Sequence, residues 1–252
     1  MPALRSVVTV AVALLLGVPP LAAQSLQQRA ATLRDGTMRF SFAAREGVCG
    51  RGEGNISVTS RSDEWEADCE PGPVRISAQV EDGRVIRLRT YVGGRWRSGT
   101  VRVEDLGTVG VREALTWLER LALAPGTLRG DPVFPMTLAD SVEPWDALLR
   151  IAKTQEASTN TRRSALFWLG QGAGAIATRH LEEVAMSDED RKLRDHAVFS
   201  LSQLRDGEGI PSLIRLARTH DDPKTRKTAF FWLGQSKDPR AVALFEEVLT
   251  RR

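Results

Sequence analysis

The sequence predicts an α+β protein in which a small antiparallel β domain with one disulfide precedes an α-solenoid of about four helix pairs. Two periodicities predict this architecture. Apolar residues alternate at a period of two between residues 74 and 90, and similar residues recur every 32 positions in the C-terminal half. We therefore expect an antiparallel β domain over residues 24–108 and a helical repeat domain over residues 109–252.

The composition is that of a globular protein without a large surplus of either charge. Of the 252 residues, 42% are hydrophobic and 27% are charged, and the formal net charge is +3. This length suffices for one large domain or two modest ones, each with its own core. Binding to phosphates requires clustered cationic side chains. The near balance of charge therefore argues against a dedicated nucleic-acid-binding protein, and we expect no nucleic-acid partner.

The first 23 residues have the order of a secretory signal peptide. Arg5 precedes an apolar run from Val7 to Val18, and the segment ends in small residues at Ala22-Ala23. The apolar run is shorter than the roughly 18–20 residues that cross a bilayer, so a signal peptide is favoured over a membrane anchor. We expect residues 1–23 to be removed, the mature protein to be periplasmic or secreted, and no membrane span to remain.

The N-terminal domain is predicted to contain one helix followed by strands. We expect a helix from Ser25 to Arg34, and strands at residues 38–42, 56–58, 74–80, 86–90 and 95–103. Asp82-Gly83 and Gly93-Gly94 are turn signals. The glycine-rich run from Cys49 to Gly54 lacks the strand-to-helix context of a phosphate loop, so we interpret it as an ordinary loop. This part of the chain resembles no family that we recognise.

The two cysteines, Cys49 and Cys69, lie twenty residues apart in this domain. In an oxidising compartment one disulfide between them would stabilise the fold by about 3 kcal/mol. Two free buried thiols are the alternative. A zinc site needs four nitrogen or sulfur ligands, and the three histidines lie more than 100 residues away. We therefore expect no metal.

A 32-residue repeat organises the C-terminal half. Within each copy the apolar residues are spaced by three or four, as on one face of a helix. Gly170 and Gly234 are predicted to end first helices with a left-handed cap, and Pro211 and Pro239 to lie in the first turn of second helices. Each copy is thus a helix–turn–helix unit that buries its apolar face by stacking. The columns with this spacing are Arg162, Arg194 and Arg226; Ala165, Ala197 and Ala229; Leu169, Leu201 and Leu233; Gln171, Gln203 and Gln235; and Val184, Leu216 and Val248.

Two earlier segments extend the array less regularly. Residues 114–118 resemble residues 165–169 of a first helix, and residues 148–154 resemble residues 213–219 of a second helix. The Pro- and Gly-rich segment 125–144 between them is predicted to be a long loop. We therefore expect an atypical first pair before the three regular ones.

The run from Asp222 to Ala241 resembles a HEAT repeat of the short bacterial phycobilisome-lyase-like type. The residues that carry the resemblance are Asp222-Pro223, Arg226, Ala229, Leu233-Gly234, Asp238-Pro239 and Ala241, and it extends over residues 111–252. The resemblance implies a solenoid that contacts other proteins. Because some relatives handle bilin chromophores, it also implies an alternative function as a chromophore-handling, lyase-like protein. A di-iron branch is marked by His-Glu pairs, which this sequence lacks.

A row of phenylalanines, Phe167, Phe199 and Phe231, follows the same period. At 100° per residue each points about 160–200° away from the alanine and leucine columns. Together with Trp168 and Trp232, the row is a candidate partner-binding strip, because contiguous exposed apolar surface marks interaction sites. The alternative is that the N-terminal sheet or the segment 125–144 covers the strip.

The remaining polar residues predict no chemistry. Arg162, Arg194 and Arg226 are expected to bond acidic turn residues of a neighbouring copy, such as Asp190 or Asp222; a basic ladder for an anionic partner is the alternative. No nucleophile–base pair, phosphate loop or dinucleotide fingerprint occurs in the sequence. We therefore expect no catalytic residue and no cofactor. The predicted function is that of a non-enzymatic, exported interaction module or scaffold with a protein partner in the cell envelope.

Overall fold

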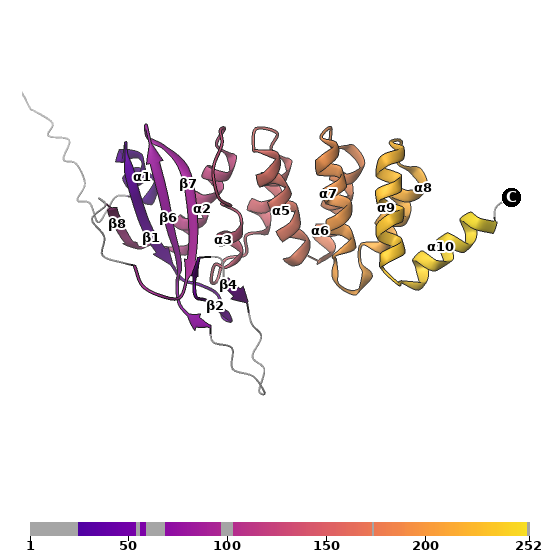
Figure 1. The fold of residues 1–252 in the computed structure, drawn as a ribbon, viewed down its shortest axis with the longest axis horizontal. Coiled ribbons are helices and arrows are strands. Elements are labelled where there is room, and N and C mark those ends of the chain that lie inside the picture. Colours follow the sequence, from indigo (N-terminus) through magenta and orange to yellow (C-terminus); the bar gives the residue numbers. More distant parts are fainter. Residues whose placement is uncertain (1–24, 54–55, 59–68, 97–102, 173, 251–252) are drawn as a thin grey trace, which may run out of the picture.

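A β-sheet region and a row of helices follow one another along the chain (Figure 1). The computed structural model describes residues 25–53, 56–58, 69–96, 103–172 and 174–250. The expected signal peptide and its cleavage after Ala23 lie outside the described residues. The mixed architecture that the two periodicities predicted is therefore present, with the helices extending to one side of the sheets.

The β region contains a five-stranded sheet of order β3-β7-β6-β1-β8 and a three-stranded sheet of order β4-β2-β5. At the predicted hairpin, Asp82 and Gly83 both have positive φ, 51° and 73°, and join β6 to β7. The strands are β1 (Gly36–Phe42), β2 (Val48–Gly50), β3 (Gly52–Glu53), β4 (Ile56–Val58), β5 (Glu70–Pro71), β6 (Val74–Glu81), β7 (Arg84–Val92) and β8 (Val103–Thr108).

The prediction of a purely antiparallel domain is wrong at one edge of the large sheet. β1 pairs antiparallel with β6, but β8 pairs with β1 in parallel. Arg95 and Trp96 are not in a strand, and β8 begins only at Val103, with residues 97–102 outside the described part. β8 therefore does not return beside β7 through a tight hairpin. It lies at the opposite edge of the sheet, where no short turn dictates an antiparallel direction.

Within the glycine-rich run, Cys49 and Gly50 lie in β2 and Gly52 and Glu53 lie in β3, in contrast to our interpretation of this run as a loop. Gly52 lies opposite Val92 of β7, so β3 extends the large sheet. A Cβ atom at Gly93, whose φ is 70°, would lie 2.2 Å from the carbonyl oxygen of Gly50. Glycine at this position is what allows the two backbones to approach one another.

Cys49 and Cys69 form the predicted disulfide, with a Cα–Cα distance of 5.4 Å. The alternative of two free thiols is therefore wrong. Cys49 lies in β2, and Cys69 directly precedes β5, which pairs with β2. The bond fastens two neighbouring strands of the small sheet to each other.

The helices of the C-terminal region stand in two rows (Figure 1). The first-helix row contains α5, α7 and α9, and the second-helix row contains α4, α6, α8 and α10. The most extensive packing joins a second helix to the next first helix, as in α6 with α7 and α8 with α9. The helices are α1 (Leu26–Thr32), α2 (Val111–Leu123), α3 (Phe134–Thr137), α4 (Trp145–Lys153), α5 (Thr159–Gly172), α6 (Gly174–Ser187), α7 (Arg191–Ser202), α8 (Ile210–Thr219), α9 (Pro223–Gln235) and α10 (Pro239–Thr250).

α2 continues the second-helix row, although its sequence resembles a first helix. An ion pair between Glu119 and Arg150 joins α2 to α4, and the other face of α2 packs on the sheet, where the rings of Trp117 and Phe40 are 5.3 Å apart. The short α3 contacts α5 from the first-helix side. The expectation of an atypical fourth pair is therefore corrected to three pairs preceded by single helices. The resemblance arises because both helices need one apolar face.

Gly170 and Gly234 lie inside helices and do not cap them, in contrast to the prediction. α5 continues to Gly172 and α9 to Gln235, and left-handed φ values occur at Gly174 (49°) and Lys237 (54°). A Cβ at Gly170 would lie 3.6 Å from the Cβ of Ser200 on α7. The small residue at this position therefore serves the close packing of α5 on α7.

One continuous hydrophobic core runs through both regions. It includes Phe40 of the sheet, Leu118 of α2, Leu169 of α5 and Leu244 of α10, all of which are buried. The sheet region and the array are therefore packed on each other and share buried apolar surface.

The close approach of α8 to the end of α7 gives a testable prediction. An ideal Cβ at Gly209 would lie 2.0 Å from the carbonyl oxygen of Leu201. We expect Gly209→Ala to lower the free energy of unfolding by about 1–3 kcal/mol because the backbone must move, as measured by urea denaturation. Gly110→Ala is the matched control, since Gly110 is also an N-cap residue and a Cβ there meets nothing within 4 Å. Equal losses in the two variants would contradict the close approach.

Candidate functional site

Aromatic side chains form a row along α3, α5, α7 and α9. Within a helix, the ring centroids of Phe167 and Trp168 are 5.1 Å apart. Between repeats, Phe199 of α7 lies 5.0 Å from Trp232 of α9. We name this row the aromatic face; its members are Phe134, Phe167, Trp168, Phe199, Phe231 and Trp232. The structure thus places all five predicted partner-binding residues on one row and adds Phe134, which the sequence analysis did not single out.

Exposure of the aromatic face differs along the array. Phe167 and Phe199 are half-buried, whereas Phe231 is 57% exposed. Phe134, which belongs to the segment 125–144, packs 5.2 Å from Trp168, so this segment covers the first position of the row. Phe199 is covered instead by the next repeat. The binding role of these residues stays a prediction. Their arrangement forms an apolar surface that is partly open to solvent.

Ser200 interrupts the row in α7, where the other two copies carry tryptophan. The residue is buried, and its Oγ has no hydrogen-bond partner among the described residues. It lies against Gly170, where α5 and α7 approach closely. The substitution of a small side chain for tryptophan therefore permits the tighter contact between these two helices.

A ladder of polar contacts runs beside the aromatic face. Ser164 donates a hydrogen bond to Asp131 (2.6 Å), and Thr228 donates one to Asp195 (3.3 Å). His196 occupies the same column between Ser164 and Thr228 and is half-buried beside Arg163. Burial lowers the pKa of His196, and the positive charge of Arg163 lowers it further.

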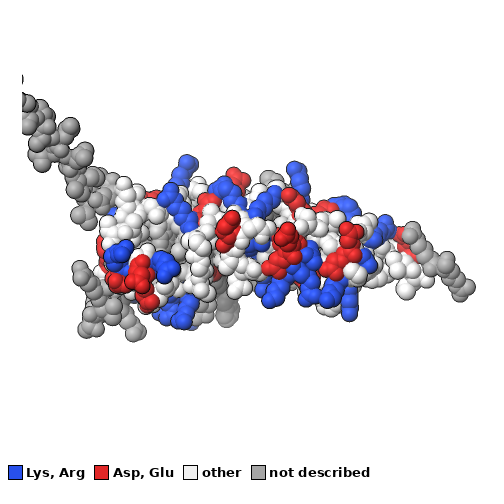
Figure 2. Space-filling view, turned by 90° about the horizontal axis from the view of Figure 1, so that it is seen from above, with Lys and Arg blue, Asp and Glu red and all other residues white. Residues whose placement is uncertain are grey.

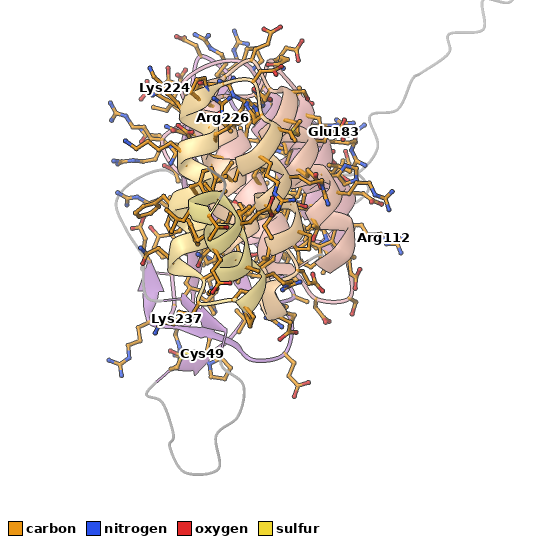
Figure 3. All side chains as sticks on the ribbon, turned by 90° about the vertical axis from the view of Figure 1, so that its right-hand side faces the viewer. Cys49, Arg112, Glu183, Lys224, Arg226 and Lys237 are labelled. Carbon is orange, nitrogen blue, oxygen red and sulfur yellow. A yellow bond between two sulfur atoms is a disulfide. The ribbon has the colours of Figure 1, made fainter. Side chains whose placement is uncertain are left out.

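The repeated arginines hold the ends of neighbouring repeats together. Arg162 is buried and donates to the carboxylate of Asp188 (2.5 Å) and to the carbonyl of Ala152 (2.9 Å). Arg194 donates to Asp222 (2.9 Å), as the sequence predicted. Arg226, seen near one end of α9 in Figure 3, donates to the carbonyls of residues 220 and 221. The structural interpretation of this column is therefore confirmed for its first two members.

Asp190 is not the partner of Arg162, which corrects that part of the prediction. Its carboxylate caps α7 by accepting a hydrogen bond from the backbone N–H of Lys192 (2.9 Å) and accepts another from Thr159 (3.0 Å). These bonds lower the pKa of Asp190 despite the opposing effect of burial. Because the cap fixes Asp190, the neighbouring Asp188 is left to pair with the arginine.

The charged side chains of the second-helix row are largely paired with one another. Seen from above, onto the helix ends, Lys and Arg side chains lie on either side of the Asp and Glu side chains along the array (Figure 2). Each ion pair joins a helix to the next one in the row, so these charges offer no uncompensated basic or acidic patch. The pairs are Glu119 with Arg150 (2.6 Å), Lys153 with Glu183 (3.0 Å), Glu182 with Arg215, and Arg218 with Glu247.

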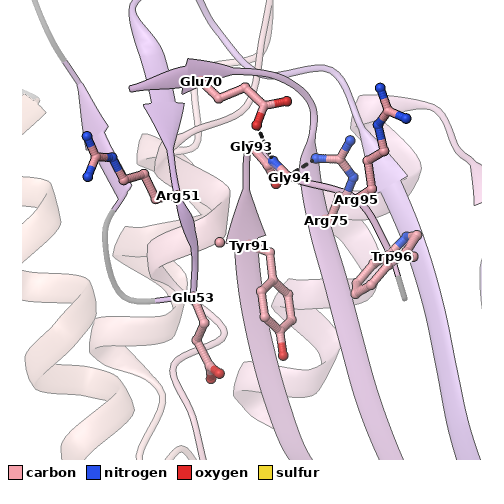
Figure 4. Close-up of a pocket in the computed structure, with 10 residues that line it drawn as sticks. Arg51, Glu53, Glu70, Arg75, Tyr91, Gly93, Gly94, Arg95 and Trp96 are labelled. Atoms are coloured by element: carbon pink, nitrogen blue, oxygen red, sulfur yellow. Dashed lines mark hydrogen bonds between the residues drawn. The ribbon is translucent and has the colours of Figure 1, made fainter. Parts of the chain in front are cut away.

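A hollow of about 850 Å³ opens at the end of β7, which the sequence analysis did not predict (Figure 4). Its lining includes Arg51, Arg75, Arg95, Tyr91 and Trp96. The rings of the last two are 5.4 Å apart. The Gly93-Gly94 turn between these aromatics was visible in the sequence, but the approach of Arg51 from β2–β3 depends on the fold.

Two general features of the described residues bear on the class of protein. No described helix combines the length and the hydropathy that a membrane span requires. In the same part of the chain, no three His, Cys, Asp or Glu side chains are grouped as a metal ion would require.

The fold belongs to the class of mixed proteins in which a β-sheet region is followed by a helical region of packed helix pairs. Residues 178–252 match the family of HEAT repeats. The match begins in α6 and continues through α10, so the C-terminal part of the chain is a HEAT-repeat array. This match identifies HEAT repeats in general and does not distinguish the phycobilisome-lyase-like type from other types. No curated protein matches the chain.

The buried arginine gives a prediction on stability. Asp188→Ala leaves the guanidinium of Arg162 buried without its counter-ion, so we expect the free energy of unfolding to fall by about 3–5 kcal/mol. Glu183→Ala, which breaks the exposed pair with Lys153, is the control and should cost less than about 1 kcal/mol. Urea denaturation measures both, and a similar loss in the two variants would contradict the structural role of Asp188.

His196 gives a prediction on pH. Its pKa in the folded state lies below the ordinary value of 6.5, so the unfolded chain binds this proton more readily than the folded one. Stability contributed by neutral His196 is therefore present above pH 6.5 and is lost as the pH falls toward the folded-state pKa. We expect His196→Gln to lose less unfolding free energy than the wild type between pH 7.5 and pH 5. Identical losses by urea denaturation would contradict this burial.

Proposed function

We propose that the protein is an exported scaffold that binds another protein of the cell envelope through the aromatic face. HEAT repeats are commonly protein-interaction scaffolds, and residues 178–252 match them. The observation that carries the proposal is the contrast between the two rows. The charges of α4, α6 and α8 are paired from helix to helix, while the first-helix row carries an aromatic strip that is half-buried at Phe167 and Phe199 and open at Phe231.

Two features support export. The first 23 residues have the order of a signal peptide. The disulfide between Cys49 and Cys69 belongs to a type of bond that persists mainly in oxidising compartments such as the periplasm.

The adjacent carboxylates of Glu182 and Glu183 support a structural role and not a catalytic one. Glu182 and Glu183 are adjacent, and the pKa of each is lowered by hydrogen bonds, chiefly from Arg215 to Glu182 and from Lys153 to Glu183. A general acid needs the opposite shift, toward neutral pH. These two residues therefore connect helices of the second-helix row.

A chromophore-handling, lyase-like role is the second candidate function. The hollow at the end of β7 favours it, because Tyr91 and Trp96 offer aromatic surface to a conjugated ligand. Its charged lining is mixed, with Arg75 and Arg95 beside the carboxylates of Glu53 and Glu70, and the arginines can pair with carboxylates of such a ligand. The purified protein should then shift the visible absorbance of added bilin. A colourless protein that leaves the bilin spectrum unchanged would exclude this role.

The scaffold proposal is tested with a variant of the aromatic face. We expect Phe167→Ser to reduce, by at least about tenfold, the recovery of a partner that the wild type captures from the envelope fraction and binds again after purification. Met186→Ser is the matched control, because Met186 is an exposed apolar residue of the second-helix row. Unfolding curves establish that both variants are folded. Equal recovery by both variants would show that the aromatic face does not bind the partner. A mature protein that retains residues 1–23 would contradict export.

A further inference from the structure

Apolar columns that are covered in the inner repeats are exposed on α10. In α8 the residues Ile210, Leu216 and Ala217 are buried, and α8 packs extensively on α9. The residues 32 positions later, Val242, Val248 and Leu249, are 49%, 47% and 82% exposed. Among the described helices, α10 exposes the apolar columns that are covered in α8, where the first helix of the next repeat packs on them.

Arg226 also lacks a contact that its counterparts in the preceding repeats make. Arg162 and Arg194 each donate to an aspartate that follows in the next turn or helix cap, Asp188 and Asp222. Arg226 keeps the equivalent bonds to the carbonyls of residues 220 and 221. It forms no ion pair with a carboxylate in the described part of the chain. Among the residues that the structure describes, none places a carboxylate beside Arg226 as Asp222 does beside Arg194.

Phe231 completes the pattern. Phe199 is half-buried because Trp232 of the following helix lies 5.0 Å from it. Phe231, in the same column, is 57% exposed. We name Arg226, Phe231, Val242, Val248 and Leu249 the end face. Figure 3 looks at the array from this end and shows Arg226 near one end of α9.

We propose that the end face binds an amphipathic helix of a partner protein in the manner in which α8 binds α9. The partner helix would carry aspartate at its N-cap to pair with Arg226 and an aromatic residue ten positions later to cover Phe231. These are the places of Asp222 and Trp232 in this chain. The inference rests on the proposed function, that the protein binds a protein partner, and specifies the chemistry of that partner.

Charge favours such a helix over a second copy of this chain. Lys224, Lys227 and Lys237 are exposed on and beside α9, as are the carboxylates of Asp221 and Glu246, and Figure 3 shows Lys224 and Lys237 at the two ends of α9. A twofold contact about Arg226 would bring two guanidinium groups together, whereas a helix with an aspartate at its N-cap supplies a carboxylate. A head-to-tail contact would need an open first repeat, but there the sheet packs on α2.

The probe is a fluorescein-labelled peptide with the sequence of residues 220–236, which contains α9 and its aspartate cap. We expect saturable binding to the full chain, measured by fluorescence anisotropy. Replacing aspartate by asparagine at the position of Asp222 in the peptide should weaken binding by at least about tenfold, because a charge-assisted hydrogen bond is lost. Arg226→Gln in the protein should weaken it similarly. Combining the two changes should add little, because they remove the same bond.

Leu249→Asp tests the apolar part of the end face. Leu249 is 82% exposed, so the substitution leaves the fold intact, and we expect it to weaken peptide binding by about tenfold or more. Met186→Asp, on the exposed surface of α6, should leave binding unchanged. Unfolding curves of both variants check the fold.

Three results would overturn the inference. The first is the absence of saturable binding at about 1 mM peptide, and the second is wild-type affinity in both Arg226→Gln and Leu249→Asp. The third is a concentration-dependent dimer, seen by sedimentation and lost in Leu249→Asp, which would assign the end face to a second copy. If Leu249→Asp keeps the envelope partner that Phe167→Ser loses, the proposed function stands and the end face is not its site. If both variants keep that partner, the proposed function fails whatever the peptide shows.

Discussion

Every repeat of the array depends on its neighbour, because a helix pair cannot bury its apolar face alone. The second helix of each pair is covered by the first helix of the next, as α8 is by α9. The same boundary carries the buried ion pair between Arg162 and Asp188 and the contact between Phe199 and Trp232. The packing of helices recurs from one repeat to the next, and arginine–aspartate pairs reinforce two of these contacts, while the aromatic contact between repeats occurs where Phe199 meets Trp232.

The apolar faces at the two sides of the array are covered to different extents. At the N-terminal end the sheet supplies the missing surface, since α2 packs on it through Trp117 and Phe40 and joins the row through Glu119 and Arg150. The disulfide between Cys49 and Cys69 links β2 to the start of β5 within the small sheet. At the C-terminal end the described residues expose Val248 and Leu249. The sheet therefore covers the N-terminal side of the array, whereas α10, the last described helix, exposes side chains whose counterparts in α8 are buried.

The binding role draws on this asymmetry. Along the second-helix row the charges neutralise one another, and they contribute little to attracting a partner. The most exposed apolar side chains of the array lie mainly at its C-terminal end, Phe231 on the first-helix row and Val242, Val248 and Leu249 on α10 of the second-helix row, and the HEAT-repeat match covers this end. A surface formed by several repeats suits an extended partner, because each repeat presents similar groups at regular intervals.

The sequence by itself determined the features that depend on local spacing. It predicted the 32-residue period, the hairpin at Asp82-Gly83 and the cysteine pair, because backbone turns and helix faces follow from neighbouring residues. Only the tertiary structure decided the parallel pairing of β8, the place of α2 in the second-helix row and the choice of Asp188 for Arg162. It also decided that Phe231 is open while Phe199 is covered. These outcomes depend on which distant surfaces meet: Phe199 is covered because Trp232 of α9 lies beside it, whereas no described helix follows to cover Phe231 in the same way.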